Sequence, residues 1–137
     1  MGDGTELGRV RGLGSAKHGA NHWWRQRITA ASNLFLLAWF IISMARMSGF
    51  DYDAMVTWVR SAWVAVPLIL LILSTCWHAR LGLQVLIEDY AEHDGRVGLL
   101  VAMEFFLAVI AVTAIFSILR IALTPVAAVA MTAAAGQ

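Results

Sequence analysis

The chain has 137 residues, enough for one domain, but its composition is unlike that of a water-soluble globule. Hydrophobic residues make up 60% and charged residues 14%, whereas soluble domains carry about 45–50% apolar and about 25% charged residues. The mean hydropathy is +0.72. With a net charge of +1, there is no basic patch interleaved with aromatic residues beyond residue 27, which excludes a nucleic-acid-binding protein. The single cysteine, Cys76, excludes an intrachain disulfide and a cysteine-rich metal site, so we interpret it as a small core residue.

The chain begins with a polar, glycine-rich and basic segment at residues 1–27. This segment lacks the apolar core of a cleavable signal peptide. The first apolar stretch follows at residues 28–45 and is interrupted only by uncharged polar residues before Arg46 closes it. Its length is close to the roughly 20 residues that a membrane-spanning helix needs. Turn-forming residues at 48–51 then break the helix.

Two further apolar stretches have the length of membrane-spanning helices. The second covers residues 62–90, longer than the hydrocarbon requires, with Pro67 in its first two turns, where a lost backbone hydrogen bond is best tolerated. A short turn is expected at residues 92–95, and the third stretch covers residues 97–119. All three are apolar on every side and rich in Leu, Ala and Ile, which argues against the alternating pattern of a β-barrel.

The sequence therefore predicts an all-α integral membrane protein. We divide it into the basic segment 1–27, a three-helix membrane domain at 28–122 and an alanine-rich tail at 123–137. The leading segment holds five of the ten lysines and arginines, so the positive-inside rule predicts a cytoplasmic N-terminus. Three crossings then put the turn at 92–95 on the cytoplasmic side and the C-terminus on the other side.

His78 lies within the second stretch, at a depth where polar groups are costly and often functional. From His78 to Asp89 there are 11 residues, a rotation of about 1100°, which returns to within about 20° of the same helix face. The two residues are about 16 Å apart along the axis, so His78 is near mid-bilayer if Asp89 is at the interface. Small residues, Ser74 and Gly82, flank His78 on that face. His78 is either a hydrogen-bonded packing residue or a metal or haem ligand.

Other polar residues within the apolar stretches also need partners. Arg80 should pair with a carboxylate or propionate, and Glu104 in the third stretch is a candidate, although a protonated Glu104 facing another subunit is an equal alternative. Tyr90 follows Asp89 at the membrane edge, where it is either an ordinary interfacial aromatic or a hydroxyl donor to a quinone carbonyl. Trp23 and Trp24 allow the same two interpretations, of which the interfacial anchor is favoured.

Two stretches resemble a known family, the small cytochrome b membrane-anchor subunits of succinate dehydrogenase, or complex II. Residues 14–17 and 22–30 (GSAK and HWWRQRITA) resemble the family's lead into its first helix. Residues 78–90 (HARLGLQVLIEDY) resemble a segment of the family in which a histidine is followed, after ten residues, by the pair Asp-Tyr. With three spans of matching order, the similarity covers roughly residues 12–122.

The resemblance implies a role for each candidate site residue. His78 would be one axial ligand of a haem b, and the other axial histidine would come from a larger anchor subunit. Tyr90 would donate a hydrogen bond to ubiquinone, with Asp89 organising that site and its protons. Arg27 would face a haem propionate or the quinone edge, and His22 could act similarly. No residue of this chain would be catalytic toward succinate, and the family gives no role to Glu104.

The resemblance also implies partners. Electrons would pass from succinate through a flavoprotein subunit with FAD and an iron–sulfur subunit, both bound at the cytoplasmic face of a bacterial inner membrane. A second three-helix anchor, the larger cytochrome b subunit, would pair with this chain. Three alternatives remain: an anchor of a fumarate reductase or menaquinone-linked enzyme, a small proton-coupled transport subunit using His78, Arg80 and Glu104, and a purely structural scaffold.

Overall fold

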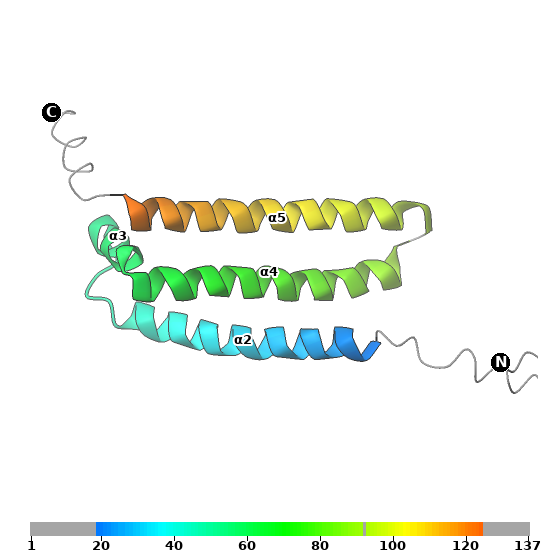
Figure 1. The fold of residues 1–137 in the computed structure, drawn as a ribbon, viewed down its shortest axis with the longest axis horizontal. Coiled ribbons are helices and arrows are strands. Elements are labelled where there is room, and N and C mark those ends of the chain that lie inside the picture. Colours follow the sequence, from blue (N-terminus) through cyan, green and yellow to red (C-terminus); the bar gives the residue numbers. More distant parts are fainter. Residues whose placement is uncertain (1–18, 92, 125–137) are drawn as a thin grey trace, which may run out of the picture.

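The computed structural model describes residues 19–91 and 93–124, which form four helices in chain order (Figure 1). These are α2 (Gly19–Ala45), α3 (Tyr52–Arg60), α4 (Ala62–Tyr90) and α5 (His93–Leu123), and the described residues contain no strand. Helices α2, α4 and α5 are each long and apolar enough to cross a membrane. The prediction of an all-α protein with three membrane spans is therefore confirmed. Most of the expected basic segment and nearly all of the alanine-rich tail lie outside the described residues.

Helix α2 begins at Gly19 rather than near Ile28, where the apolar stretch starts. Residues 20–27 contain no proline or glycine, so nothing in the sequence stops the helix at the edge of the apolar stretch. The helix ends near Ala45, where the Arg46 backbone N–H still donates to the Ile42 carbonyl at 3.2 Å. The result is a helix whose first two turns are polar and aromatic and whose remainder is apolar.

The short helix α3 was not predicted from the sequence. Asp51 caps its N-terminus, because its side chain accepts a hydrogen bond from the Ala54 backbone N–H at 3.3 Å. The preceding turn is tight, since a Cβ atom at Gly49 would lie 2.8 Å from the Asp51 carboxylate. Trp58 ties α3 to α2 through a hydrogen bond from its indole N–H to the Ser43 hydroxyl at 3.1 Å. The loop between the first two spans is thus an ordered helix attached to the bundle.

Helix α4 has 29 residues, or about 43 Å, and exceeds a hydrocarbon core of about 30 Å, as expected. Its bounds agree with the predicted stretch, and Pro67 lies near its start. The connection to α5 is shorter than the predicted turn at 92–95, because α5 already begins at His93. The first turn of a helix has N–H groups without helical partners, so it readily accommodates polar residues.

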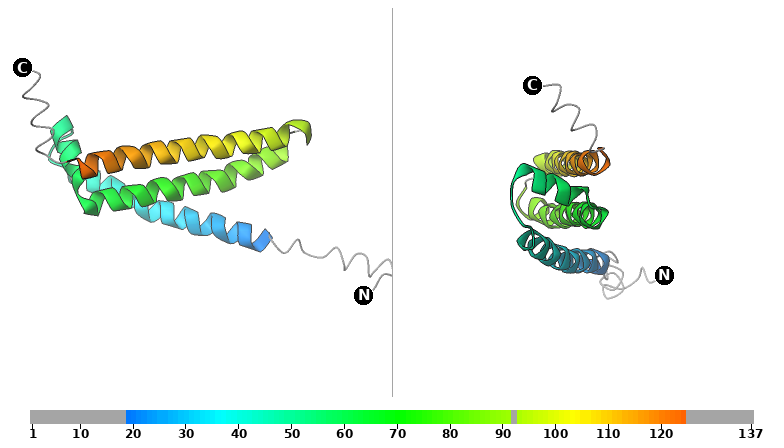
Figure 2. Two further views of the ribbon diagram at one scale, coloured as in Figure 1. Left: turned by 45° about the horizontal axis from the view of Figure 1, so that its top comes forward. Right: turned by 90° about the vertical axis from the view of Figure 1, so that its left-hand side faces the viewer.

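The three long helices form a single layer with α4 in the middle (Figures 1 and 2). Helix α4 packs against α2 on one side and α5 on the other, whereas α2 and α5 do not contact each other. Helix α3 crosses one end of the layer against α4 and α5. The first residues of α2, the last of α4 and the first of α5 share the opposite end (Figure 1), which we call the Tyr90 end.

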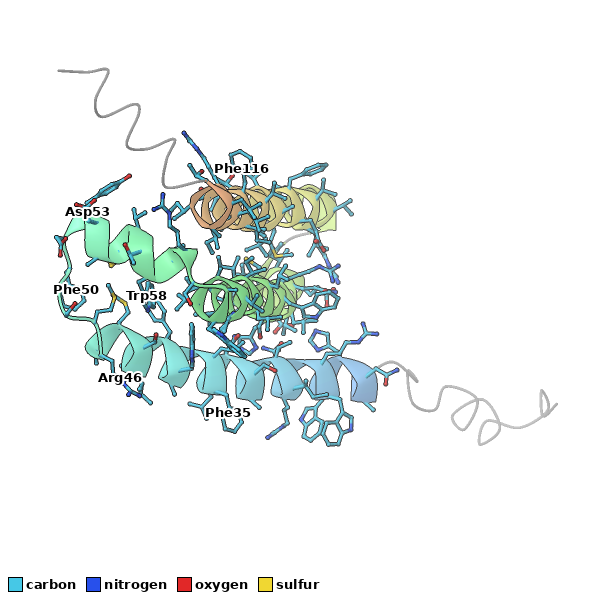
Figure 3. All side chains as sticks on the ribbon, turned by 60° about the vertical axis from the view of Figure 1, so that its left-hand side comes forward. Phe35, Arg46, Phe50, Asp53, Trp58 and Phe116 are labelled. Carbon is cyan, nitrogen blue, oxygen red and sulfur yellow. The ribbon has the colours of Figure 1, made fainter. Side chains whose placement is uncertain are left out.

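A single layer of helices cannot enclose a core. Among the described residues, the buried hydrophobic side chains are Val64, Ala65, Leu81 and Met103. Large apolar side chains instead cover the outside, as Phe35 on α2 and Phe116 on α5 show (Figure 3). An apolar surface of this extent is stable against lipid or another protein but not against water. The three long helices therefore need lipid or another protein around them, in agreement with their length and composition as membrane spans.

Candidate functional site

His78 lies in the middle of α4 and faces α2. Its Nδ1 atom is 3.0 Å from the hydroxyl oxygen of Thr29 on α2, and its side chain is half-buried. The imidazole is therefore held at the seam between two helices and does not project freely from the layer. His78 lies within its span, as predicted from the sequence, whereas its contact with Thr29 was not predicted.

A line of polar side chains on α2 faces this seam. Within 22–33 the half-buried positions are His22, Gln26, Thr29, Ser32 and Asn33. Of these, His22, Gln26, Thr29 and Asn33 are spaced by four, three and four residues, which keeps them on one helix face. The polar atoms His22 Nε2, Gln26 Oε1 and Asn33 Oδ1 are buried and have no hydrogen-bond partner among the described residues. Such groups are costly in an apolar setting. The seam therefore offers hydrogen-bonding capacity near His78 that the described chain does not use.

Both small residues predicted beside His78 lie at this seam. A Cβ atom at Gly82 would be 3.6 Å from the Gln26 side-chain nitrogen, so Gln26 packs where Gly82 has no side chain. The Ser74 hydroxyl is buried without a partner among the described residues. Thr29 opposite His78 and Gln26 opposite Gly82 fix the antiparallel register of α2 and α4.

Arg80 pairs with Glu104 of α5, which is one of the two alternatives predicted from the sequence for Glu104. The Arg80 Nε atom donates to Glu104 Oε1, and the side chains are 40% and 46% exposed in the isolated chain. Arg80 is only two residues from His78 along α4, so the two residues differ in depth by about 3 Å. The ion pair neutralises both charges in the apolar part of the layer and joins α4 to α5.

Asp89 and Tyr90 lie at the end of α4, on the exterior of the chain. Tyr90 is 81% exposed, Asp89 is also exposed, and neither side chain makes a hydrogen bond or ion pair with another described residue. Their neighbour Glu88 is engaged within the chain, since it accepts from Gln84 at 3.0 Å and lies 3.6 Å from Arg96 of α5. The phenol and the Asp89 carboxylate are thus exposed and make no polar contact with another described residue.

Arg27 stacks on Trp23 at the same end of α2. Its guanidinium carbon lies 4.3 Å from the Trp23 ring centre, and the Trp23 and Trp24 rings meet edge to face at 5.2 Å. By the register of α2 and α4, Arg27 lies opposite residues 80–81, about 13 Å along the axis from Asp89. Arg27 therefore shares the approximate depth of His78, but it is exposed and, two residues from Thr29, lies on a different face of α2. The structure joins it to neither His78 nor Asp89 and Tyr90.

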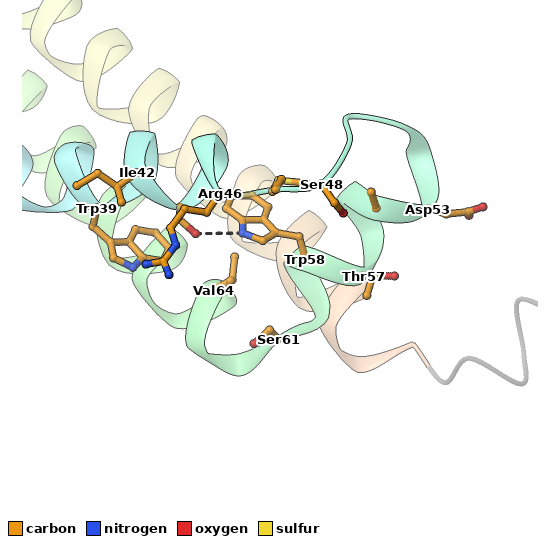
Figure 4. A pocket seen from close by; sticks show the side chains of 12 residues that line it. Trp39, Ile42, Arg46, Ser48, Asp53, Thr57, Trp58, Ser61 and Val64 are labelled. Carbon is orange, nitrogen blue, oxygen red and sulfur yellow. Dashed lines mark hydrogen bonds between the residues drawn. The ribbon is translucent and has the colours of Figure 1, made fainter.

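A cleft of about 760 Å³ opens at the other end of the layer (Figure 4). It lies where α2, α3 and α4 meet, and Trp39, Arg46 and Trp58 are among its lining residues. None of the predicted site residues lines it, so it does not correspond to the predicted quinone site. Cavity size alone therefore does not identify the site, which rests on the chemistry of the residues at the α2–α4 seam and at the Tyr90 end.

The described residues contain no group of three or more His, Cys, Asp or Glu side chains that could hold a metal ion. A bare ion usually needs several such ligands from the protein. A haem iron differs, because the porphyrin supplies its equatorial ligands and the protein supplies only the axial ones. A single histidine such as His78 is compatible with the second case without further ligands from the described residues.

Comparison with known proteins identifies the family. The family of succinate dehydrogenase/fumarate reductase transmembrane subunits matches residues 1–119. The chain belongs to this family. Like the resemblance in the two sequence stretches, this match describes a membrane-anchor subunit, and the three spans agree with it.

Curated relatives of this family are succinate dehydrogenase hydrophobic membrane anchor subunits. The chain is 30% identical over 103 residues to that of Rickettsia bellii, covering 74% of this chain and 82% of the relative. It is 24% identical over 114 residues to that of Paracoccus denitrificans, covering 83% and 88%. No solved structure gives a significant match. We conclude that the chain is a multi-pass membrane-anchor subunit of the succinate dehydrogenase type, as predicted.

Proposed function

We propose that this anchor subunit binds haem b through His78 and presents Asp89 and Tyr90 to ubiquinone. The observation that carries the proposal is the His78 imidazole, held by Thr29 near the middle of a membrane span. A bound haem would supply one-electron transfer, with His78 as the residue of this chain that holds it. By the family resemblance, the larger cytochrome b anchor would supply the second histidine ligand. No other histidine of the described residues lies at the depth of His78.

The surroundings of His78 suit such a group. Arg80 is paired with Glu104, so among the described residues Arg27, at nearly the same depth as His78, is a candidate cation for a haem propionate. The register favours this role of Arg27 over a contact with the quinone edge, because Asp89 and Tyr90 are about 13 Å further along the axis. Along the axis, His22 lies between Arg27 and the level of Asp89 and Tyr90. Its buried Nε2 atom has no hydrogen-bond partner among the described residues.

The Tyr90 end suits a quinone. Reduction of a quinone to a quinol takes up two electrons and two protons, so a site needs a hydrogen-bond donor to the carbonyl and a route for protons. Tyr90 supplies an exposed hydroxyl, and the exposed Asp89 carboxylate beside it can relay protons from water. The electrons would come from an iron–sulfur subunit fed by a flavoprotein with FAD, both docked on the cytoplasmic side of a bacterial inner membrane.

This placement agrees with the orientation inferred from charge. The start of α2, which carries Arg25 and Arg27, lies at the Tyr90 end of the layer, so a cytoplasmic N-terminus puts Asp89 and Tyr90 on the side of the soluble subunits. Relatives named for succinate dehydrogenase favour succinate oxidation over fumarate reduction as the direction of electron flow. Membership of an electron-transfer family also favours haem and quinone binding over the transport alternative.

The haem assignment is tested in the purified whole complex. We expect a b-type signal in the reduced-minus-oxidised spectrum, and a large loss of that signal per flavin in His78→Ala. Cys76→Ala, two residues away on the same helix, is the control and should retain the signal. A full haem signal in His78→Ala, with normal subunit content, would contradict the assignment of this ligand.

A further inference from the structure

The hydroxyl of Thr29 makes three close polar contacts. Its oxygen lies 2.9 Å from the Arg25 carbonyl oxygen, 3.1 Å from the Gln26 carbonyl oxygen and 3.0 Å from His78 Nδ1. The first two are contacts within α2, whereas the third reaches α4. The hydroxyl therefore connects the backbone of one helix to the imidazole on the next.

The number of protons at this junction fixes the direction of the hydrogen bonds. A hydroxyl has one proton to donate, and carbonyl oxygens can only accept. If the hydroxyl donates to a carbonyl of α2, its lone pair is available to an Nδ1–H of His78, and both contacts are attractive. If it donates to Nδ1 instead, its lone pairs face two carbonyl oxygens at 2.9 and 3.1 Å with no proton between them. The first arrangement is therefore favoured, and Nδ1 carries the proton.

We infer that Thr29 is a positioning residue for His78, whose hydroxyl holds the imidazole with Nδ1 protonated and the lone pair on Nε2. A neutral imidazole has only one proton on its two nitrogens, so a protonated Nδ1 leaves Nε2 able to bind iron. The contact also restricts rotation of the ring, since it joins the side chain to a second helix. This inference rests on the proposed haem function and adds to it a residue from α2.

An acceptor on Nδ1–H changes the ligand electronically as well as sterically. Hydrogen bonding of the outer nitrogen increases the basicity of a ligating histidine. A more basic ligand stabilises ferric over ferrous haem. Removing the Thr29 hydroxyl should therefore make the haem easier to reduce.

The test compares Thr29→Val with Thr29→Ser in the purified complex. Valine preserves the shape of threonine without the hydroxyl, and serine preserves the hydroxyl without the methyl group. At a fixed ambient potential near the midpoint, we expect about a threefold higher ratio of reduced to oxidised haem in Thr29→Val. This corresponds to about 30 mV, at about 59 mV per tenfold for one electron. The low-spin ferric EPR signal should also shift in Thr29→Val, and Thr29→Ser should match wild type in both measurements.

A matched control separates this contact from a general loss of hydroxyl groups in α2. Ser32 donates to the Ile28 carbonyl at 2.9 Å and has no side-chain partner among the described residues, so Ser32→Ala should leave the haem potential unchanged. Equal potentials in wild type and Thr29→Val, or equal shifts in the valine and serine variants, would overturn the inference. If Thr29→Val does not assemble, Thr29→Ala is measured in its place. Failure of both to assemble while Thr29→Ser does would show a folding role and also overturn it. A wild-type complex without haem would instead refute the proposed function.

Discussion

The ion pair between Arg80 and Glu104 allows a sharp prediction about stability. Arg80 lies about 3 Å along the α4 axis from His78, in the apolar part of the span. The substitution Glu104→Leu leaves this arginine without its partner. An unpaired arginine at the centre of a membrane helix costs about 2.5–3.5 kcal/mol on the insertion scale. Interhelical hydrogen bonds in membranes average only about 0.6 kcal/mol. Because the pair is both charged and hydrogen-bonded, we expect each single substitution to destabilise the complex by about 1–3 kcal/mol.

The decisive measurement is a double-mutant cycle. Replacing both members of a charged pair by apolar residues often leaves stability unchanged, whereas removing one partner leaves an uncompensated charge and lowers stability. The double variant Arg80→Leu, Glu104→Leu should therefore be more stable than either single variant. Stability is measured as the detergent concentration at which the lipid-embedded complex loses its subunits. Losses that simply add in the double variant would show no coupling, and would refute the reasoning that the pair neutralises charge within the membrane.

Three further results are expected from the described geometry. Tyr90→Phe should selectively lower quinone reduction while succinate oxidation by an artificial dye stays normal. Tyr52→Phe is its matched control, because Tyr52 is also 77% exposed but lies at the other end of the layer; equal activity in both variants would argue against a quinone contact. Arg27→Gln should weaken haem retention more than quinone affinity, since Arg27 lies near the depth of His78; the haem-to-flavin ratio and the quinone KM distinguish the two. Asp51→Ala should destabilise α3 by about 1 kcal/mol through loss of its N-cap, which amide hydrogen exchange over α3 would report; unchanged exchange would contradict the capping role.

The apolar stretches were sufficient to predict the spans. Length and hydropathy located α4 almost to the residue, because the constraint of crossing hydrocarbon acts on every position of the helix. The pairing of Arg80 with Glu104 was one of two equal alternatives from the sequence, because a charge at that depth needs a partner and Glu104 is the acid within the third stretch.

Features that depend on how helices meet could not be derived in the same way. Thr29 resembles any other uncharged residue in an apolar helix until the register of α2 against α4 brings it to His78. The spacing of His22, Gln26, Thr29 and Asn33 was the available signal, because four polar residues on one face of a membrane helix require polar neighbours. Helix α3 is short and amphipathic, and its main sequence signal was the capping residue Asp51.

The central claim is that the His78 side chain ligates haem iron within the membrane. EPR of the oxidised complex, normalised to flavin, tests it most directly. We predict a low-spin ferric signal in wild type that is lost in His78→Ala, either with the haem or by conversion to high spin. A low-spin signal of wild-type intensity in His78→Ala would contradict this account of the subunit.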